Sequence, residues 1–314
     1  MGENFWPVES IKAKEENSLP REESVLRKQE NMIALARRLE GVYAKRPEME
    51  DFEGVMADTK FANDYSKESI NKDLLYVEDT RNKIDIANSS RGQAALDHFE
   101  ENFAFAEAAQ AMIVDRLNSW LPDFKSIMTS DYDDLFGVDL VTKHKDGGYF
   151  GTAYDATVSS NPDNIKNKLS KNWKNNISKG SLPVVKYFQD PDTGQKGRIL
   201  VPKFIIGASA TDVNDMAKAY LAGTESSLDA HPFRKLMLDQ IEIQLNDALY
   251  YFEDHQDDPR FNLARREYTR VKEMIKGVKQ QLVDSNVIDP LAYHEYSKNS
   301  LALKMINEFS DKKE

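Results

Sequence analysis

Apolar positions change along the chain from helical spacing to an alternating pattern and back to helical spacing. Residues 1–90 are highly charged and show only modest helical stripes, and we expect about the first 20 to be loosely ordered. From Arg91 to Leu117 the apolar residues recur at three- and four-residue steps, and Pro122 follows. This spacing predicts one long helix with a single packed face.

The middle region has the shorter period of a sheet. The pair Gly147-Gly148 supplies the backbone freedom that a tight hairpin needs, and the run from Asp190 to Gly194 is typical of a turn. We therefore expect two pairs of strands, each joined by a short connection, with a shorter strand before the first pair. The expected strands are Phe124–Met128, Phe136–Lys143, Tyr149–Val158, Pro183–Phe188 and Ile199–Ala208.

Helices are expected between the strand pairs and after them. Ser160-Asn161-Pro162-Asp163 combines capping residues, an early proline and a first-turn carboxylate, which predicts a helix to about Ser178. A short helix should follow from Thr211, and three more should run over Pro232–His255, over Pro259–Val283 and from Pro290 onward. The order predicts an α/β (α+β) fold with a small mixed sheet flanked by helices and with helical extensions at both ends. We divide it into a charged, partly disordered region at 1–90, a core at 91–223 and a helical appendage at 224–314.

Composition narrows the class of protein. The 314 residues carry a net charge of −11, which excludes a basic surface over the whole chain but leaves a local one open. The absence of cysteine excludes disulfides, thiolate metal sites and cysteine nucleophiles. No apolar run approaches the roughly 18 residues of a membrane span, and the start does not resemble a signal peptide. We expect a cytoplasmic protein without a membrane segment.

Two aspartates interrupt apolar strands. Asp139 lies among Val138, Leu140 and Val141, and Asp155 lies in the next expected strand. If the hairpin is symmetric about its glycines, the two carboxylates emerge side by side on one face of the sheet. The two carboxylates repel each other unless a cation neutralises their charge. Mg²⁺ or Mn²⁺ suits this role, because both ions take oxygen ligands. The alternative is that both aspartates sit at strand ends, where they are solvated or hydrogen-bonded to loop amides.

A basic segment follows this acidic pair. Between residues 161 and 203, nine lysines and arginines oppose three aspartates, a net charge of +6. A basic helix and hairpin beside paired acids would hold the phosphates of DNA or RNA while a metal acts on one of them. The alternative is a solubilising lysine face. The candidate phosphate-binding residues are Lys168, Lys171, Lys174 and Arg198.

The arrangement over residues 91–208 resembles the PD-(D/E)XK nuclease-like superfamily. Asp134-Leu-Phe-Gly-Val-Asp139 stands in the place of that family's first motif, and Asp155-Ala-Thr157 in the place of its second. The resemblance implies a restriction-endonuclease-like core of a helix, three meandering strands, a second helix and a further strand. It also implies a metal-binding carboxylate on the first helix, for which we choose Glu107, with Glu100 and Glu101 as rivals.

One residue departs from the family pattern. Thr157 occupies the place of the motif lysine, which in the family is thought to orient or activate the attacking water. Lys166, at the border of the apolar stripe of Ile165 and Leu169, or Lys143, on the face of Asp139, are the candidate substitutes. Three hypotheses follow: a Mg²⁺-dependent nuclease, a catalytically inactive relative that binds nucleic acid, or an assembly protein that binds a partner protein through its acidic helical ends.

Overall fold

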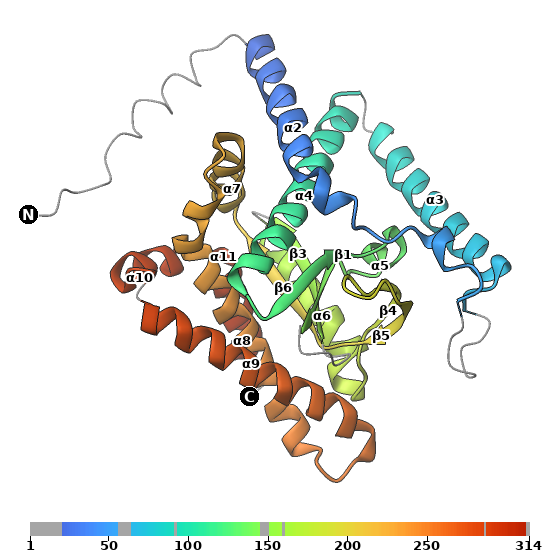
Figure 1. Ribbon diagram of the computed structural model, residues 1–314, viewed down its shortest axis with the longest axis vertical. Coiled ribbons are helices and arrows are strands. Elements are labelled where there is room, and N and C mark those ends of the chain that lie inside the picture. Colours follow the sequence, from blue (N-terminus) through green and yellow to red (C-terminus); the bar gives the residue numbers. More distant parts are fainter. Residues whose placement is uncertain are drawn as a thin grey trace, which may run out of the picture.

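A four-stranded sheet lies at the centre of the molecule (Figure 1). The computed structural model describes residues 21–55, 64–90, 93–144, 151–158, 161–285 and 287–311, without the side chains of 21–29, 88 and 93–103. The strands stand side by side in the order β1, β2, β3 and β6, and neighbours are antiparallel except for β6, which runs parallel to β3. Their bounds are β1 Phe124–Met128, β2 Leu140–His144, β3 Gly151–Val158 and β6 Lys203–Ala208.

The predicted strand pairs are confirmed, with two corrections. The expected strand at Phe136–Lys143 begins only at Leu140, because Ser130 caps a short helix, α5 (Asp131–Leu135), that precedes it. The expected strand at Ile199–Ala208 is two strands, β5 (Lys196–Leu200) and β6. Proline cannot donate a ladder hydrogen bond, and Pro202 stands where the chain leaves the β4–β5 hairpin for the main sheet. Strand β4 is Val184–Gln189.

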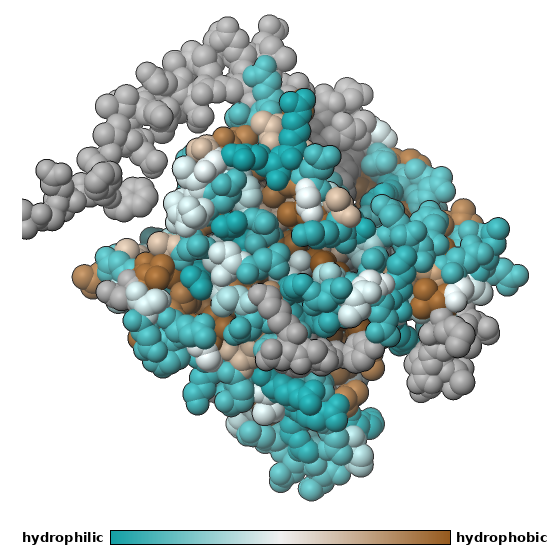
Figure 2. Space-filling model, in the orientation of Figure 1, coloured by the Kyte–Doolittle hydropathy of each residue, from teal (hydrophilic) through white to brown (hydrophobic). Residues whose placement is uncertain are grey.

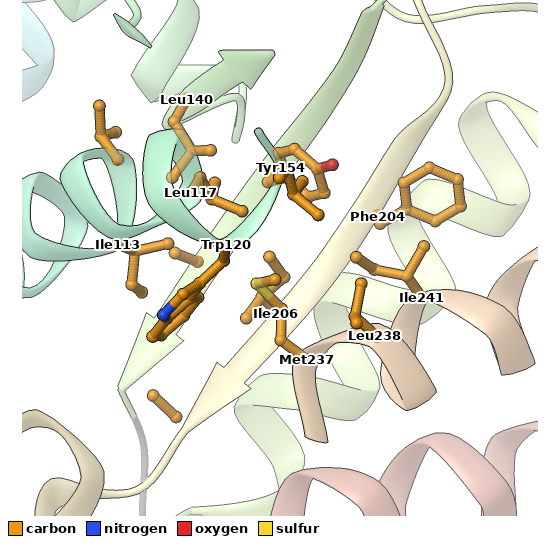
Figure 3. Close-up of a cluster of buried hydrophobic side chains, with 14 of the residues drawn as sticks. Ile113, Leu117, Trp120, Leu140, Tyr154, Phe204, Ile206, Met237, Leu238 and Ile241 are labelled. Carbon is orange, nitrogen blue, oxygen red and sulfur yellow. The ribbon is translucent and has the colours of Figure 1, made fainter. Parts of the chain in front are cut away.

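Apolar side chains of helices α4 (Gln93–Trp120) and α8 (Pro232–Asp254) cover one face of the sheet (Figure 3). Trp120 from α4, Tyr154 from β3 and Phe204 from β6 belong to one buried cluster. Two buried glutamines of α8 also close the free edge of β6. Gln240 and Gln244 each donate to one backbone carbonyl of β6 and accept from one backbone N–H, which satisfies the N–H and C=O groups of Gly207 and Ile205 at this edge.

Helix α6 (Pro162–Asn175) and the β4–β5 hairpin cover the opposite face. Ile165 and Leu169 of α6 pack with Ile205 of β6 and with α11 (Leu301–Ser310). Nearer the other edge, Val141 and Ala153 pack with the hairpin. Helix α6 and the hairpin together form the crossover that a parallel pair such as β3 and β6 requires.

The predicted helices are confirmed, with shifted ends. Helix α4 corresponds to the expected helix at Arg91–Leu117, and residues 91 and 92 lie outside the described residues. The expected helix at Pro259–Val283 starts as a single 3₁₀ turn before α9, and the expected helix from Pro290 onward is two helices, because Ser300 caps a new one. The remaining helices are α2 Arg21–Tyr43, α3 Lys67–Ser89, α7 Ala210–Ala222, α9 Asn262–Ser285 and α10 Pro290–Lys298.

Both terminal regions pack against the central unit. Leu35 and Leu39 of α2 join the same buried cluster as α4, and Tyr65 donates from its hydroxyl to the carbonyl of Lys186 in β4 at 2.6 Å. The cluster also continues without a break across residues 223 and 224 into α8 and α9. The C-terminal helices therefore share the core of the sheet. Among the described residues, no helix is long and apolar enough to cross a membrane.

Candidate active site

The β2–β3 hairpin brings Asp139 beside the segment that carries Asp155. The observed pairs run from Lys143 with Gly151 to Leu140 with Tyr154, and just before β2 the backbone N–H of Asp139 donates to the carbonyl of Tyr154 at 2.9 Å. The observed pairs are centred on Gly147, one of the two glycines that predicted the hairpin, and the turn itself lies outside the described residues. Both aspartates are buried, each with 4% of its surface exposed, on the sheet face that α6 and the hairpin cover.

Gly137 makes the close approach of these segments possible. Its φ of +74° turns the chain from α5 toward β2, in a region of backbone space that favours glycine. A Cβ atom at this position would lie 2.7 Å from Oδ2 of Asp155 and 2.9 Å from Nζ of Lys203. Any side chain here would therefore displace the carboxylate or the ammonium group, so the glycine is required by the geometry of the site.

Two lysines from different elements bind Asp155. Lys168 on α6 donates from Nζ to Oδ1, and Lys203 at the start of β6 lies with Nζ 3.2 Å from Oδ2. Lys203 is itself 8% exposed. In β6, Ile205 is the register partner of Asp155, so the helix that packs on Ile205 also brings Lys168 over the carboxylate. A buried charge requires such partners, and this carboxylate has one on each oxygen.

Asp139 lacks this compensation. Its Oδ2 accepts one hydrogen bond from the backbone N–H of Ala156, at 2.8 Å. Burial raises the pKa of Asp139 well above its ordinary range, and the charges of Asp155 and Asp134 raise it further, while Lys168 opposes the shift. Deprotonation of Asp139 would therefore leave this end of the site with an excess of negative charge.

An arginine from the N-terminal region binds the outer carboxylates. Arg46 follows α2, and its guanidinium lies 3.4 Å from Asp134, 2.8 Å from Asp131 and 3.6 Å from Glu107. Its Nε also donates to the carbonyl of Thr129 at 2.8 Å. Burial raises the pKa of Glu107, Arg46 lowers it, and Asp134 and Asp131 raise it, so Glu107 belongs to the same acidic group.

The ammonium of Lys168 stays charged. Burial lowers the pKa of Lys168, but the carboxylates of Asp155 and Asp139 more than offset this, and the pKa lies above its ordinary value. A lysine in this state donates hydrogen bonds and supplies positive charge, and it cannot accept a proton from water. Thr157, in the place of the motif lysine, is the second residue after Asp155 in β3 and thus on the same sheet face.

The structure places the other predicted lysines elsewhere. Lys166 lies 3.0 Å from Glu308 on α11, and Lys143 binds Asp190 in the turn after β4. Neither ammonium is among those that bind Asp155. A helical wheel gives the angle between side chains but not the neighbour at each angle, and here the neighbour beside Lys166 is α11.

The predicted phosphate-binding residues divide into two groups. Lys171 and Lys174 are exposed on α6, and within the described residues neither forms an ion pair. Lys171 lies one turn after Lys168, which brings it to the side of the helix nearest the site. Arg198 instead lies 3.0 Å from Asp64 of the N-terminal region. The side chains of Glu100 and Glu101 lie outside the described residues.

Sequence reasoning gave no role at the site to Lys203 or Arg46. Lys203 opens the apolar run Phe-Ile-Ile-Gly-Ala, so it is a charge at the start of a buried strand, the same kind of anomaly that marked Asp139. That signal would have found it. Arg46 lies in a charged stretch with no such contrast, and only the packing of α2 on α4 brings it to the site.

The donor set at Asp139 fits a hard divalent cation. The donors are carboxylate oxygens, and the excess negative charge around Asp139 is what such an ion would neutralise. Within the described residues, no three His, Asp or Glu side chains already stand in a metal-binding arrangement. Mg²⁺ is commonly held by one or two carboxylates together with water and substrate phosphate, and Asp139 and Asp155 supply that number.

The chain matches no family model, no curated protein and no solved structure.

Proposed function

We propose that this protein is a divalent-metal-dependent phosphodiesterase that cleaves nucleic acid, with Mg²⁺ or Mn²⁺ as the metal. One observation carries the proposal: two buried carboxylates lie close together, because Asp139, just before β2, accepts a hydrogen bond from the residue that follows Asp155 in β3, and a lysine ammonium binds Asp155. A structural role would require hydrogen-bond donors to balance both carboxylates. Only Asp155 is balanced in that way.

Each residue has a distinct task in this proposal. A bound divalent ion lowers the pKa of a coordinated water and stabilises charge on the phosphate. Asp139 and Asp155 would hold that ion, and Asp139 would bind it as the deprotonated carboxylate. Lys168, which is cationic, donates to the reacting phosphate group as its charge grows. Lys203 fixes the second oxygen of Asp155 and so orients this carboxylate.

Glu107 is proposed as an outer ligand that depends on Arg46. Its carboxylate lies in the same acidic group as Asp134, but the Arg46 guanidinium now occupies the space between them. Glu107 would therefore bind the ion only if Arg46 moved. The exposed ammonium groups of Lys171 and Lys174 are proposed to contact the flanking phosphates, since they lie on the same helix as Lys168.

The topology supports the resemblance to the PD-(D/E)XK nuclease-like superfamily. Along the chain, α4, the meander β1–β2–β3, α6 and β6 come in the order that the resemblance implies, with α5 inserted between β1 and β2 and the β4–β5 hairpin inserted between α6 and β6. Asp155 stands in β3 as expected, Asp139 stands one residue before β2, and Lys168 provides an ammonium group where Thr157 lacks one. The topology equally suits a relative that binds nucleic acid without cleaving it, so the test below measures cleavage and metal binding separately.

The test uses the full-length protein with Mg²⁺, with Mn²⁺ and with a chelator. Labelled single-stranded DNA, duplex DNA and RNA are the substrates, and calorimetry measures binding of Mn²⁺. We expect cleavage of at least one substrate with metal and none with chelator, and we expect Asp155→Asn to remove it. Asp190→Asn is the matched control, because Asp190 is also buried and lysine-paired but lies outside the site.

The outcomes separate the three hypotheses. Metal binding and oligonucleotide binding without cleavage would identify an inactive relative. If every nucleic acid stays intact and calorimetry detects no ion, the proposal is wrong and an assembly role through the C-terminal helices becomes the better hypothesis. Equal loss of activity in Asp155→Asn and Asp190→Asn would show that the loss is not specific to the proposed site, and the site assignment would be wrong.

A further inference from the structure

Three aromatic rings gather beside the candidate active site, where α3 meets α5. The rings of Tyr76 and Phe136 are stacked, with centroids 5.7 Å apart and planes 22° apart, and Tyr132 contacts both, with centroids 6.3 Å and 4.8 Å away. Tyr76 is 45% exposed and Phe136 is 55% exposed. We call Tyr76, Tyr132 and Phe136 the aromatic platform.

Much of the surface of these rings takes no part in the packing of the protein. Tyr132 packs at the edge of the N-terminal cluster of Phe52, Tyr65 and Tyr187, whereas the ring of Phe136 leaves more than half of its surface to solvent. On the face drawn in Figure 2 the surface is mostly hydrophilic, with separate hydrophobic patches at its right-hand side, where Figure 1 places α3. Exposed rings of this size suit a flat apolar ligand.

The platform adjoins the carboxylates. Phe136 directly precedes Gly137. A Cβ atom added at Gly137 would lie 2.7 Å from Oδ2 of Asp155. Consecutive Cα atoms are about 3.8 Å apart, so the backbone of Phe136 lies close beside the proposed catalytic group. Asp139 follows only three residues later. If a ligand bound to the platform, the group attached next to its bound part would therefore lie near Asp155 and Asp139.

Cationic side chains flank the rings. The ammonium of Lys186 lies 5.4 Å from the centroid of the Tyr132 ring. On α3, Arg81 lies 2.7 Å from Asp131, a carboxylate that already binds Arg46 at 2.8 Å. Asp131 is therefore bound by two guanidinium groups, and Asp73, whose charge helps to raise the pKa of Tyr132, is bound by Lys186. Flat apolar faces with cations at their edge match a nucleobase attached to a phosphate backbone.

We propose that the aromatic platform binds an unpaired nucleobase adjacent to the scissile phosphate, so that the substrate is single-stranded nucleic acid. This inference rests on the proposed function and adds the substrate class. Inside a duplex, neighbouring base pairs cover both faces of a base, whereas a base in a single strand can stack on a protein ring. Phe136 has the largest exposed ring of the three, so it provides the principal stacking surface.

Binding is measured apart from cleavage, by fluorescence anisotropy in a chelator with a labelled oligothymidylate and with a blunt duplex. We expect the wild-type protein to bind the single strand more tightly than the duplex. Phe136→Ala should weaken binding to the single strand by roughly 5- to 150-fold, the range for loss of one base stack, and leave duplex binding within twofold. Phe136→Trp should restore it, since it restores a ring.

Tyr250→Ala is the matched control, because Tyr250 on α8 is 65% exposed and lies outside the platform. Thermal unfolding of each variant checks that the fold is intact. We expect Phe136→Ala to fold normally, because Phe136 is largely exposed. Equal affinity of wild type and Phe136→Ala for the single strand would overturn the inference, as would equal weakening for both nucleic acids. Failure of the proposed function looks different: the chelator assay would still show Phe136-dependent binding, but no metal would give cleavage.

Discussion

Two buried aspartates six residues apart, Asp133 and Asp139, differ in how the fold satisfies them. Asp133 accepts hydrogen bonds from the backbone N–H groups of Lys186 and Tyr187, at 2.7 Å and 3.0 Å, and from the hydroxyl of Ser130 at 2.8 Å. Asp139 accepts one backbone N–H, and carboxylates lie around it. Both are almost fully buried, at 2% and 4% exposure, so burial alone does not distinguish them.

The difference shows which buried acid is structural. Burial raises the pKa of Asp133, but its three donors lower it in part and tie α5 to β4. In Asp139 the neighbouring acids Asp155 and Asp134 add to the effect of burial. A fold gains stability from the first arrangement and loses stability through the second, which is the usual sign of a group kept for binding or catalysis.

The sharpest test exchanges each carboxylate for its neutral amide. Asp139→Asn should reduce cleavage by about 10³-fold, because it removes a metal ligand, while the variant unfolds at the same or a higher urea concentration at pH 7. Asp133→Asn should cost about 3 kcal/mol of unfolding free energy, because one N–H donor then faces an NH₂ group, with cleavage by the folded fraction retained. If Asp133→Asn lost cleavage and Asp139→Asn lost stability, the roles assigned to the two aspartates would be wrong.

The second test compares the two lysines of α6. Lys168→Met should lower the cleavage rate by about 10²-fold, the usual cost of losing one charge-stabilising donor in an active site. Lys166→Met removes only the ion pair with Glu308, so we expect a change of less than about twofold. The prediction from sequence that Lys166 serves the site requires the opposite order. Steady-state cleavage assays on the same substrate decide between them.

The smallest effect is the pH dependence of stability without metal. Because the pKa of Asp139 is raised in the folded state, the native protein keeps a proton there that the unfolded chain loses near pH 4. The resulting stability is complete below about pH 4 and falls by about 1.4 kcal/mol per pH unit until the raised pKa is passed. Urea unfolding of wild type and Asp139→Asn across pH 4 to 8 should show a shallower fall in the variant. Parallel curves would mean that Asp139 is not the proton carrier.

Metal binding should reverse this trend. The ion binds the deprotonated carboxylate, so the affinity for Mn²⁺ should rise with pH over the range in which Asp139 holds its proton. Calorimetry in two buffers of different ionisation enthalpy would detect the released proton, and its absence in Asp139→Asn is the control.

The sequence by itself determined most of the local structure. Alternation, turn glycines and capping residues predicted the hairpin, because these signals act between residues close in the chain. The contrast between a charge and an apolar strand identified Asp139 and Asp155. The same local reasoning missed α5, and it took the segment through Pro202 as one strand, because the exchange of sheets at that proline depends on distant partners.

Tertiary structure alone decided which groups meet the carboxylates. Lys168 reaches Asp155 because α6 packs on Ile205, and Lys166 turns to α11, a helix more than 130 residues further along the chain. Arg46 comes from a segment before the β2–β3 hairpin in the chain, and Lys203 comes from β6, which follows the hairpin. Side-chain periodicity fixes an angle about a helix or strand, whereas the charge that stands at that angle depends on which distant element packs there, and burial makes that choice decisive for the chemistry.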